Sequence, residues 1–158
     1  MPTRTFRITA LPSASFAHFF ELNELQLAAT GAARVIADQH PGFPCRVSLA
    51  DAEVGEELLL VPFEHHAVPS PYRATGPIYV RRNAVTASPR AGEIPGYVAR
   101  RLISVRAYDR AHWMVEALVS DGQDLRPHFE RLFSDPRVDY LHLHNAKQGC
   151  FSCRVDRV

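Results

Sequence analysis

The sequence predicts an α+β fold: a single domain, residues 1–158, with a mainly antiparallel mixed sheet, about three helices and a β-hairpin at its C-terminal end. Short stretches of alternating apolar and polar residues, bounded by proline and glycine, are typical of strands. Apolar residues recur at helical spacing in only a few places. The length of 158 residues, with 46% hydrophobic and 22% charged residues, indicates one globular domain that buries roughly two thirds of its unfolded surface.

The first third of the chain is expected to alternate short strands with short helices. A helix after Pro12 places several phenylalanines on one side, with Ser13 or Ser15 as its N-cap. A second helix begins at Asn23 and ends at Gly31, which suits the left-handed conformation of a helix C-terminus. The extended segments expected here are 5–9, 34–37 and 45–49, the last two separated by a proline-rich turn at 40–44.

The middle of the chain contains the candidate central strand. Residues 57–63 include a run of aliphatic side chains without alternation, which indicates a strand covered on both faces. The elements expected after it are a loop stiffened by prolines at 67–77, a strand at 78–82, a mobile polar stretch at 88–96, an antiparallel pair at 102–108 and 113–119, and a helix capped by Asp124.

The C-terminal hairpin is expected to have two chemically different faces, because side chains alternate along a strand. One face carries the apolar side chains of Leu141, Leu143, Phe151, Cys153 and Val155. The other face carries the polar side chains of Tyr140, His142, His144, Cys150, Ser152 and Arg154. Imidazole, thiol, hydroxyl and guanidinium groups together in a small area indicate a functional site.

Net charge and cysteine content limit the partners and the compartment. The formal net charge of +1 gives no electrostatic drive toward nucleic acid or an acidic membrane, so we expect neither as a partner. No stretch approaches the roughly 20 apolar residues of a membrane span, and residues 1–12 lack the apolar core of a signal peptide. Three cysteines, an odd number, indicate free thiols in a reducing compartment. We therefore expect a cytoplasmic protein.

The loop at 67–77 adds candidate binding residues. It follows a buried strand, and its prolines would present Tyr72 and Arg73 to a ligand in a fixed pose. Glu64 and His65 precede this loop and are further candidates. In the alternative interpretation, Arg73 forms an ion pair with a carboxylate such as Glu64 or Asp51, and the arginine has a structural role.

The tripeptide Pro44-Cys45-Arg46 contains a second candidate arginine. The guanidinium of Arg46 offers two parallel donors to a phosphate or carboxylate, and it would favour a thiolate at Cys45. A nucleophilic Cys45 requires a histidine nearby as its base. Alternatively, Cys45 is a small buried apolar residue and Arg46 is a structural anchor.

Three functions are compatible with these residues. In the first, a small anionic molecule binds among Arg46, Tyr72, Arg73, His142, His144 and Asn145, with the imidazoles available for proton transfer in an enzyme. In the second, His142, His144 and Cys150 hold a metal such as zinc, although the charge of Arg154 on the same face opposes a cation. In the third, the polar residues form internal networks in a non-catalytic interaction module.

Several short blocks, read together, resemble a known family. They are Pro44-Cys45-Arg46, Glu64-His65, Ser70 to Ala74, Gly76-Pro77-Ile78, Val105 to Asp109, His142 to Ala146 and Gly149-Cys150. In this order they resemble the bacterial family called domain of unknown function 1203, with a similarity that runs from Phe6 to Arg157. The resemblance implies a small, single-domain bacterial protein and no particular reaction.

Overall fold

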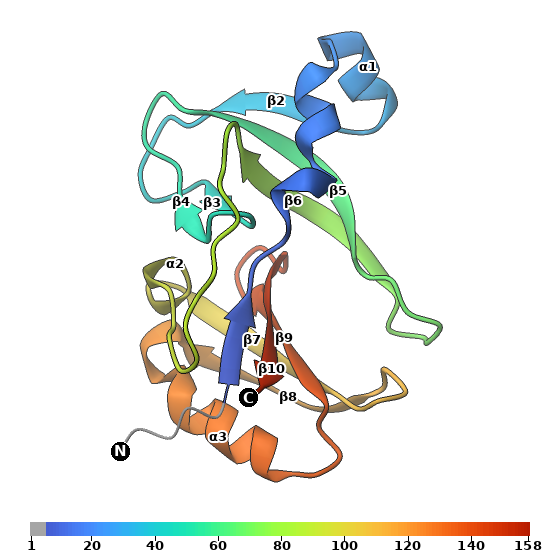
Figure 1. Cartoon of the computed structure of the whole chain (residues 1–158), viewed down its shortest axis with the longest axis vertical. Coiled ribbons are helices and arrows are strands. Elements are labelled where there is room, and N and C mark those ends of the chain that lie inside the picture. Colours follow the sequence, from blue (N-terminus) through green and yellow to red (C-terminus); the bar gives the residue numbers. More distant parts are fainter. Residues whose placement is uncertain (1–5) are drawn as a thin grey trace.

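Two five-stranded sheets form the frame of the protein in the computed structural model, which describes residues 6–158 (Figure 1). The predicted α+β class, with three helices and a C-terminal hairpin, is confirmed. Thr5, where the predicted first strand begins, and the start of the segment considered as a signal peptide lie outside the described residues. None of the helices within 6–158 combines the length and the apolar character that a membrane-spanning helix requires.

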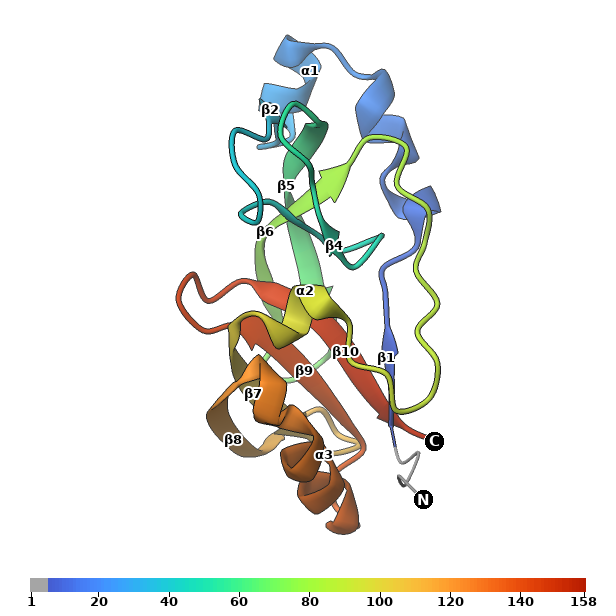
Figure 2. The ribbon, with the colours of Figure 1, turned by 90° about the vertical axis from the view of Figure 1, so that its left-hand side faces the viewer.

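The first sheet, which we call sheet A, is antiparallel throughout and has the strand order β1-β10-β9-β7-β8. Its strands are β1 (Phe6–Thr9), β7 (Leu102–Tyr108), β8 (Met114–Asp121), β9 (Tyr140–Asn145) and β10 (Phe151–Arg157). Helix α3 (Leu125–Ser134) buries Leu125, Phe129 and Leu132 against one face of this sheet. The predicted side-chain cap by Asp124 is wrong, since a 3-10 turn at 122–124 leads directly into the helix. The lower half of Figure 2 shows this helix lying along the sheet.

The second sheet, sheet B, has the order β2-β5-β6-β3-β4. Its strands are β2 (Ala33–Ile36), β3 (Pro44–Cys45), β4 (Ala50–Asp51), β5 (Glu57–His66) and β6 (Ala74–Arg81). Leu58 and Leu59, adjacent in β5, are both fully buried and belong to two different apolar clusters. The first half of β5 is therefore covered on both faces, as the uninterrupted aliphatic run predicts.

Several predicted boundaries are wrong. Strand β6 begins at Ala74, so the last residues of the predicted loop extend the β5–β6 hairpin. The predicted strand at 45–49 is only β3, because the chain turns after Cys45 and Leu49 adopts a φ of 52°. The first helix is a pair of 3-10 turns, Ser13–Ser15 and Ala17–Glu21, without a side-chain cap. The Asn23 cap is confirmed in helix α1 (Glu24–Ala29).

Helix α2 (Gly96–Ala99) was not expected, and it fixes the start of β7. The 3-10 turn at 122–124 packs so closely on it that a Cβ at Gly122 would lie 2.1 Å from the carbonyl oxygen of Val98. The amide of Gly122 donates to the carbonyl oxygen of Arg101 over 2.7 Å. These contacts hold Arg101 between the two sheets, where its side chain pairs with Asp51 of the second sheet.

A β-bulge between Phe151 and Cys153 changes the faces of the C-terminal hairpin. Phe151 pairs with His144, whereas Cys153 pairs with Leu143, so one extra residue is accommodated. The ring of Phe151 therefore lies among the histidines, and the hydroxyl of Ser152 contacts the hydroxyl of Tyr97 in the core at 3.0 Å. The predicted faces of these two residues are wrong, because strict alternation assumes an uninterrupted ladder.

Candidate functional site: an arginine-lined cavity beside a histidine cluster

A cavity of about 330 Å³ lies where sheets A and B meet. Its walls come from both sheets: Gly42, Pro44, Arg46, Leu60, Pro77 and Tyr79 from the side of sheet B, and Arg101, Asn145, Gln148 and Cys150 from the side of sheet A. The volume is at the lower end of the range typical of small-molecule sites. The side chains at its sheet A end are polar or charged, whereas Leu60 and the prolines make other walls apolar.

Arg46 is the charged residue most deeply placed in this wall, with 1% of its surface exposed. Its Nε donates to the carbonyl oxygen of Phe151 over 2.7 Å, its Nη1 to that of Pro44, and its Nη2 to Cys150 Sγ over 3.0 Å. No carboxylate in residues 6–158 pairs with this guanidinium. A buried charge without an opposite charge is costly, so within the described chain the guanidinium depends on these three hydrogen-bond partners.

Asn145 lies beside Cys150 at the C-terminal end of β9. Its side chain is 3% exposed, and its Nδ2 lies 3.6 Å from Cys150 Sγ, while its Oδ1 is buried without a hydrogen-bond partner in the described chain. The backbone holds it in place, because its amide donates to the carbonyl oxygen of Cys150 and its carbonyl accepts from Gly149. A buried acceptor without a donor is expected where a ligand or a water completes the site.

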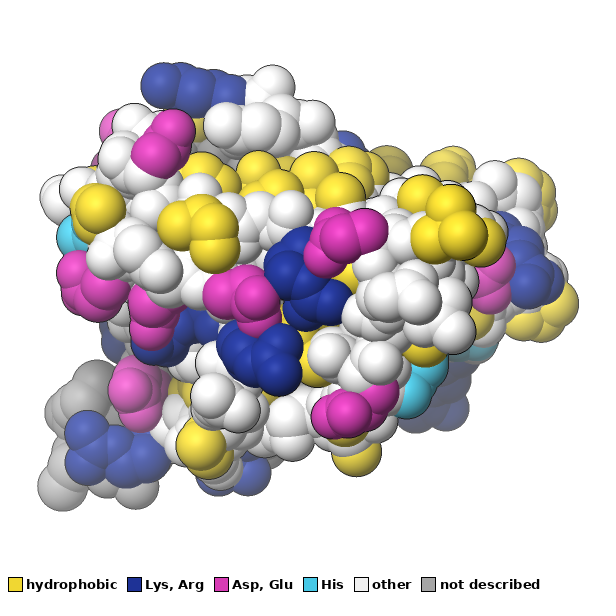
Figure 3. Space-filling view, turned by 90° about the horizontal axis from the view of Figure 1, so that it is seen from above, with side chains coloured by type: hydrophobic (Ala, Val, Ile, Leu, Met, Phe, Trp, Pro, Cys, Tyr) yellow, Lys and Arg dark blue, Asp and Glu magenta, His cyan; other side chains and the backbone are white. Residues whose placement is uncertain are grey.

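Two further arginines share one carboxylate near the cavity. The carboxylate of Asp51 is fully buried and accepts from two arginines, Arg100 over 3.2 Å and Arg101 over 3.1 Å. One carboxylate thus neutralises only one of these two guanidinium groups, and Arg46 adds a charge that no carboxylate within residues 6–158 compensates. In contrast, acidic and basic side chains lie beside one another on the face in Figure 3.

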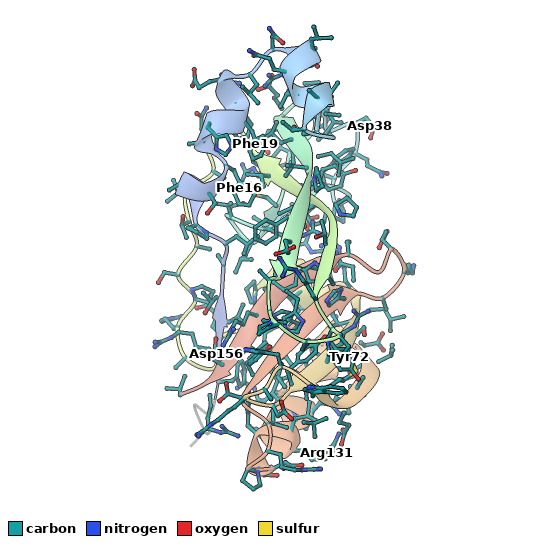
Figure 4. The ribbon with its side chains drawn as sticks, turned by 90° about the vertical axis from the view of Figure 1, so that its right-hand side faces the viewer. Phe16, Phe19, Asp38, Tyr72, Arg131 and Asp156 are labelled. Atoms are coloured by element: carbon teal, nitrogen blue, oxygen red, sulfur yellow. The ribbon has the colours of Figure 1, made fainter. Side chains whose placement is uncertain are left out.

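A second polar region, the histidine cluster, lies beneath the tip of the β5–β6 hairpin. It consists of His65, His66, His112, His142 and His144, together with Tyr108, Tyr140 and Phe151. The side chains of the β9 members project from the face of sheet A that is opposite α3. Figure 4 shows Tyr72 at the tip of the hairpin, over sheet A. Its ring meets Tyr108 at a centroid distance of 5.9 Å.

Part of the cluster is a hydrogen-bonded chain. His66 Nδ1 lies 2.8 Å from the carbonyl oxygen of Tyr72, to which it donates, so its Nε2 accepts from the hydroxyl of Tyr140 over 2.6 Å. His112 Nδ1 lies 2.8 Å from the same hydroxyl and donates to it. One phenol therefore links two imidazoles from different segments of the chain.

Burial keeps four histidines of the cluster uncharged: His65, His66, His142 and His144. Desolvation lowers the pKa of His142 to about 2 and the pKa values of His65 and His144 to about 4, and the charges of neighbouring histidines and arginines act in the same direction. Burial also lowers the pKa of His66 and raises the pKa of Tyr140 to about 12. At neutral pH these groups are neutral imidazoles and a neutral phenol.

The metal interpretation lacks an assembled ligand set in the described residues. No three His, Cys, Asp or Glu side chains within 6–158 are placed to hold a metal ion. Cys150 Sγ accepts from Arg46, and both nitrogens of His144 have partners, the carbonyl oxygen of Gly149 at 2.9 Å and Arg106 Nη1 at 3.4 Å.

Other predicted binding residues lie outside the cavity. Arg73 is 62% exposed in its side chain and forms a two-pronged ion pair with Glu64, with distances of 2.9 and 3.2 Å. This geometry matches the alternative in which Glu64 ties the arginine down. Cys45 is fully buried, and its sulfur accepts from the backbone amides of Ser48 and Arg81.

The predicted site residues thus divide between two neighbouring regions. Arg46 and Asn145 line the cavity, and His65, His142 and His144 belong to the histidine cluster. Phe151 lies between them: its carbonyl oxygen accepts from Arg46, and its ring stacks on His65 with the centroids 5.2 Å apart. The place of Arg101 in the cavity wall and the link that Tyr140 forms between two histidines depend on tertiary contacts, so the sequence carries no signal for either role.

Comparison with known proteins identifies the family. Searches of curated proteins and of solved structures found no match. Residues 42–157 match the family described as a protein of unknown function, DUF1203. This range includes every residue that lines the cavity and every member of the histidine cluster, whereas the expected resemblance of residues 6–41 is not part of it. Since the match covers most of the chain, the protein belongs to the DUF1203 family.

Proposed function

We propose that the protein binds a small anionic molecule in the cavity between the two sheets. The observation that carries this proposal is the fully buried guanidinium of Arg46, which borders the cavity and has two carbonyl oxygens and a thiol as partners. Arg101 and Arg100 supply further positive charge through a pair in which two guanidinium groups share one carboxylate. Arginine is well suited to phosphate and carboxylate, because its planar donors match the geometry of these groups.

The ligand has a polar end and an apolar end in this proposal. Its anionic group lies near Arg46 and Asn145, and the unpartnered Oδ1 of Asn145 accepts from a hydroxyl or amino group of the ligand. Its remaining atoms lie along Leu60, Pro77 and the ring of Tyr79. We further propose that the protein acts in a reducing compartment such as the bacterial cytoplasm, in keeping with its three free thiols.

Calorimetric titration with inorganic phosphate at constant ionic strength tests the anion site. Wild-type protein should bind phosphate, and Arg46→Lys should weaken binding about tenfold or more, because lysine cannot reproduce the forked donors. Asn145→Ala serves as a second variant if Arg46→Lys fails to fold. Arg73→Ala is the matched control, since it removes an exposed arginine that already has a carboxylate partner. Equal weakening by Arg73→Ala, or no binding by the wild type, would refute the proposal.

A further inference from the structure

Cys150 is the thiol that the cavity makes accessible. Cys45 and Cys153 are 0% and 1% exposed, and burial raises the pKa of Cys153 to about 12. Cys150 is partly exposed and forms part of the cavity wall at the end of the β9–β10 turn. The three cysteines therefore differ sharply in their access to a ligand.

The groups around the Cys150 sulfur are donors. Arg46 Nη2 lies 3.0 Å from Sγ and Asn145 Nδ2 lies 3.6 Å from it. A guanidinium and an amide are thus directed at one sulfur, and the thiolate is the form of cysteine that reacts as a nucleophile. The carboxylate of Asp51 is already shared by Arg100 and Arg101.

Independent observations indicate that a ligand comes close to this sulfur. Asn145 is almost completely buried, lines the same cavity and has an Oδ1 without a partner in the described chain. Arg46 has partners for only three of its five N–H groups within residues 6–158. An anion held by the free N–H groups of Arg46, in a ligand whose hydroxyl or amino group donates to Asn145 Oδ1, would lie against Cys150.

We propose that Cys150 is a nucleophile whose sulfur attacks small electrophiles that carry a carboxylate or phosphate group. This inference rests on the proposed anion site, which would hold the charged group while the reactive carbon faces Sγ. The thiol proton passes to water, the sulfur electron pair forms an S–C bond, and the leaving group departs from the same carbon with its own electron pair. The product is a thioether at Cys150 and the free leaving group. Arg46 and Asn145 position the sulfur and the anion.

Alkylation with two matched reagents tests the inference. Iodoacetate and iodoacetamide share the reactive carbon and the iodide leaving group, but only iodoacetate is charged. Peptide mass spectrometry gives the rate of alkylation of Cys150 by each reagent, first in the native protein and then in urea.

The ratio of the iodoacetate rate to the iodoacetamide rate should be about tenfold higher in the native protein than in urea, because the positive cavity concentrates the anion. Phosphate should slow the iodoacetate reaction, and Cys45 and Cys153 should stay unlabelled in the native state.

Variants separate the two proposals. Arg46→Lys and Asn145→Ala should each lower the native ratio toward its value in urea, and either variant suffices if the other does not fold. A native ratio equal to that in urea would overturn the role of Cys150. Phosphate binding by Cys150→Ser would then show that the anion site itself still stands. If neither the wild type nor Cys150→Ser binds phosphate, the anion site itself is overturned.

Discussion

The cavity and the histidine cluster are neighbouring polar regions that differ in the charge of their buried groups. In the cavity wall, the positive charge of Arg46 has no carboxylate partner among the described residues. In the cluster, burial holds His65, His142 and His144 neutral, and the rings pack on one another, with the centroids of His66 and His142 only 4.8 Å apart. A buried charge at a cavity favours an anionic ligand, whereas packed neutral rings can stabilise the fold by themselves. In our proposal the first region binds the ligand and the second has a mainly structural role.

The largest effect we expect is a loss of stability on acidification, and it comes from the histidine cluster. His65, His142 and His144 have folded-state pKa values between about 2 and 4, below the ordinary value of 6.5. Unfolded chains therefore bind more protons than folded ones below pH 6.5, and the free energy of unfolding falls as the pH decreases through this window. Three such protons give a slope that approaches about 4 kcal/mol per pH unit near pH 5. Urea denaturation at several pH values between 7.5 and 5 measures it.

The control for this prediction is His142→Leu. Nδ1 of His142 is buried without a partner in the described chain, so leucine removes one titrating group without breaking a hydrogen bond of that atom. The slope of the free energy of unfolding against pH should be smaller in the variant by the contribution of one proton, near 1.4 kcal/mol per pH unit. A stability that stays constant between pH 6.5 and 5 in the wild type would contradict the neutral, buried state of the cluster.

The second prediction concerns the hydroxyl that joins His66 and His112. Tyr140→Phe leaves His66 Nε2 and His112 Nδ1 without this partner, and we expect a loss of about 2 kcal/mol in the free energy of unfolding. Tyr72→Phe is the control, since the Tyr72 hydroxyl makes no hydrogen bond within residues 6–158, and it should change stability by less than about 0.5 kcal/mol. Phosphate affinity should be the same in both variants. A weaker affinity in Tyr140→Phe alone would show that the cluster and the cavity act as one site.

The sequence predicted the elements of the fold better than the composition of the site. Leu58 and Leu59 marked a strand covered on both faces, and Asn23 marked a helix start, because these signals are local. The bulge at Phe151 has no comparable local signal, so alternation assigned this ring to the wrong face. The bulge also sets the separation of the two regions: it turns the ring of Phe151 toward His65 while its carbonyl oxygen meets Arg46.

Site residues were predicted by chemical type, and chemical type alone does not determine which residues meet. Arg46 and Arg73 were equivalent candidates in the sequence, yet one is buried at the cavity and the other is paired at the surface. The difference arises from contacts between residues far apart in the chain, such as Arg46 with Phe151 and Cys150. Such pairing cannot be obtained from periodicity or spacing.

The smallest expected effect is that of Arg73→Ala, which tests whether the exposed arginine belongs to either region. Its ion pair with Glu64 is exposed on both sides, with side-chain exposures of 62% and 38%, and such pairs contribute about 0 to 1 kcal/mol. We expect Arg73→Ala to change the free energy of unfolding by less than about 1 kcal/mol. This difference between the variant and the wild type should become smaller at high salt, because salt screens the ion pair in the wild type. Urea denaturation at low and at high salt measures this change. A loss of several kcal/mol, or one that salt does not reduce, would place Arg73 in the structural network of the histidine cluster and extend that region to the surface.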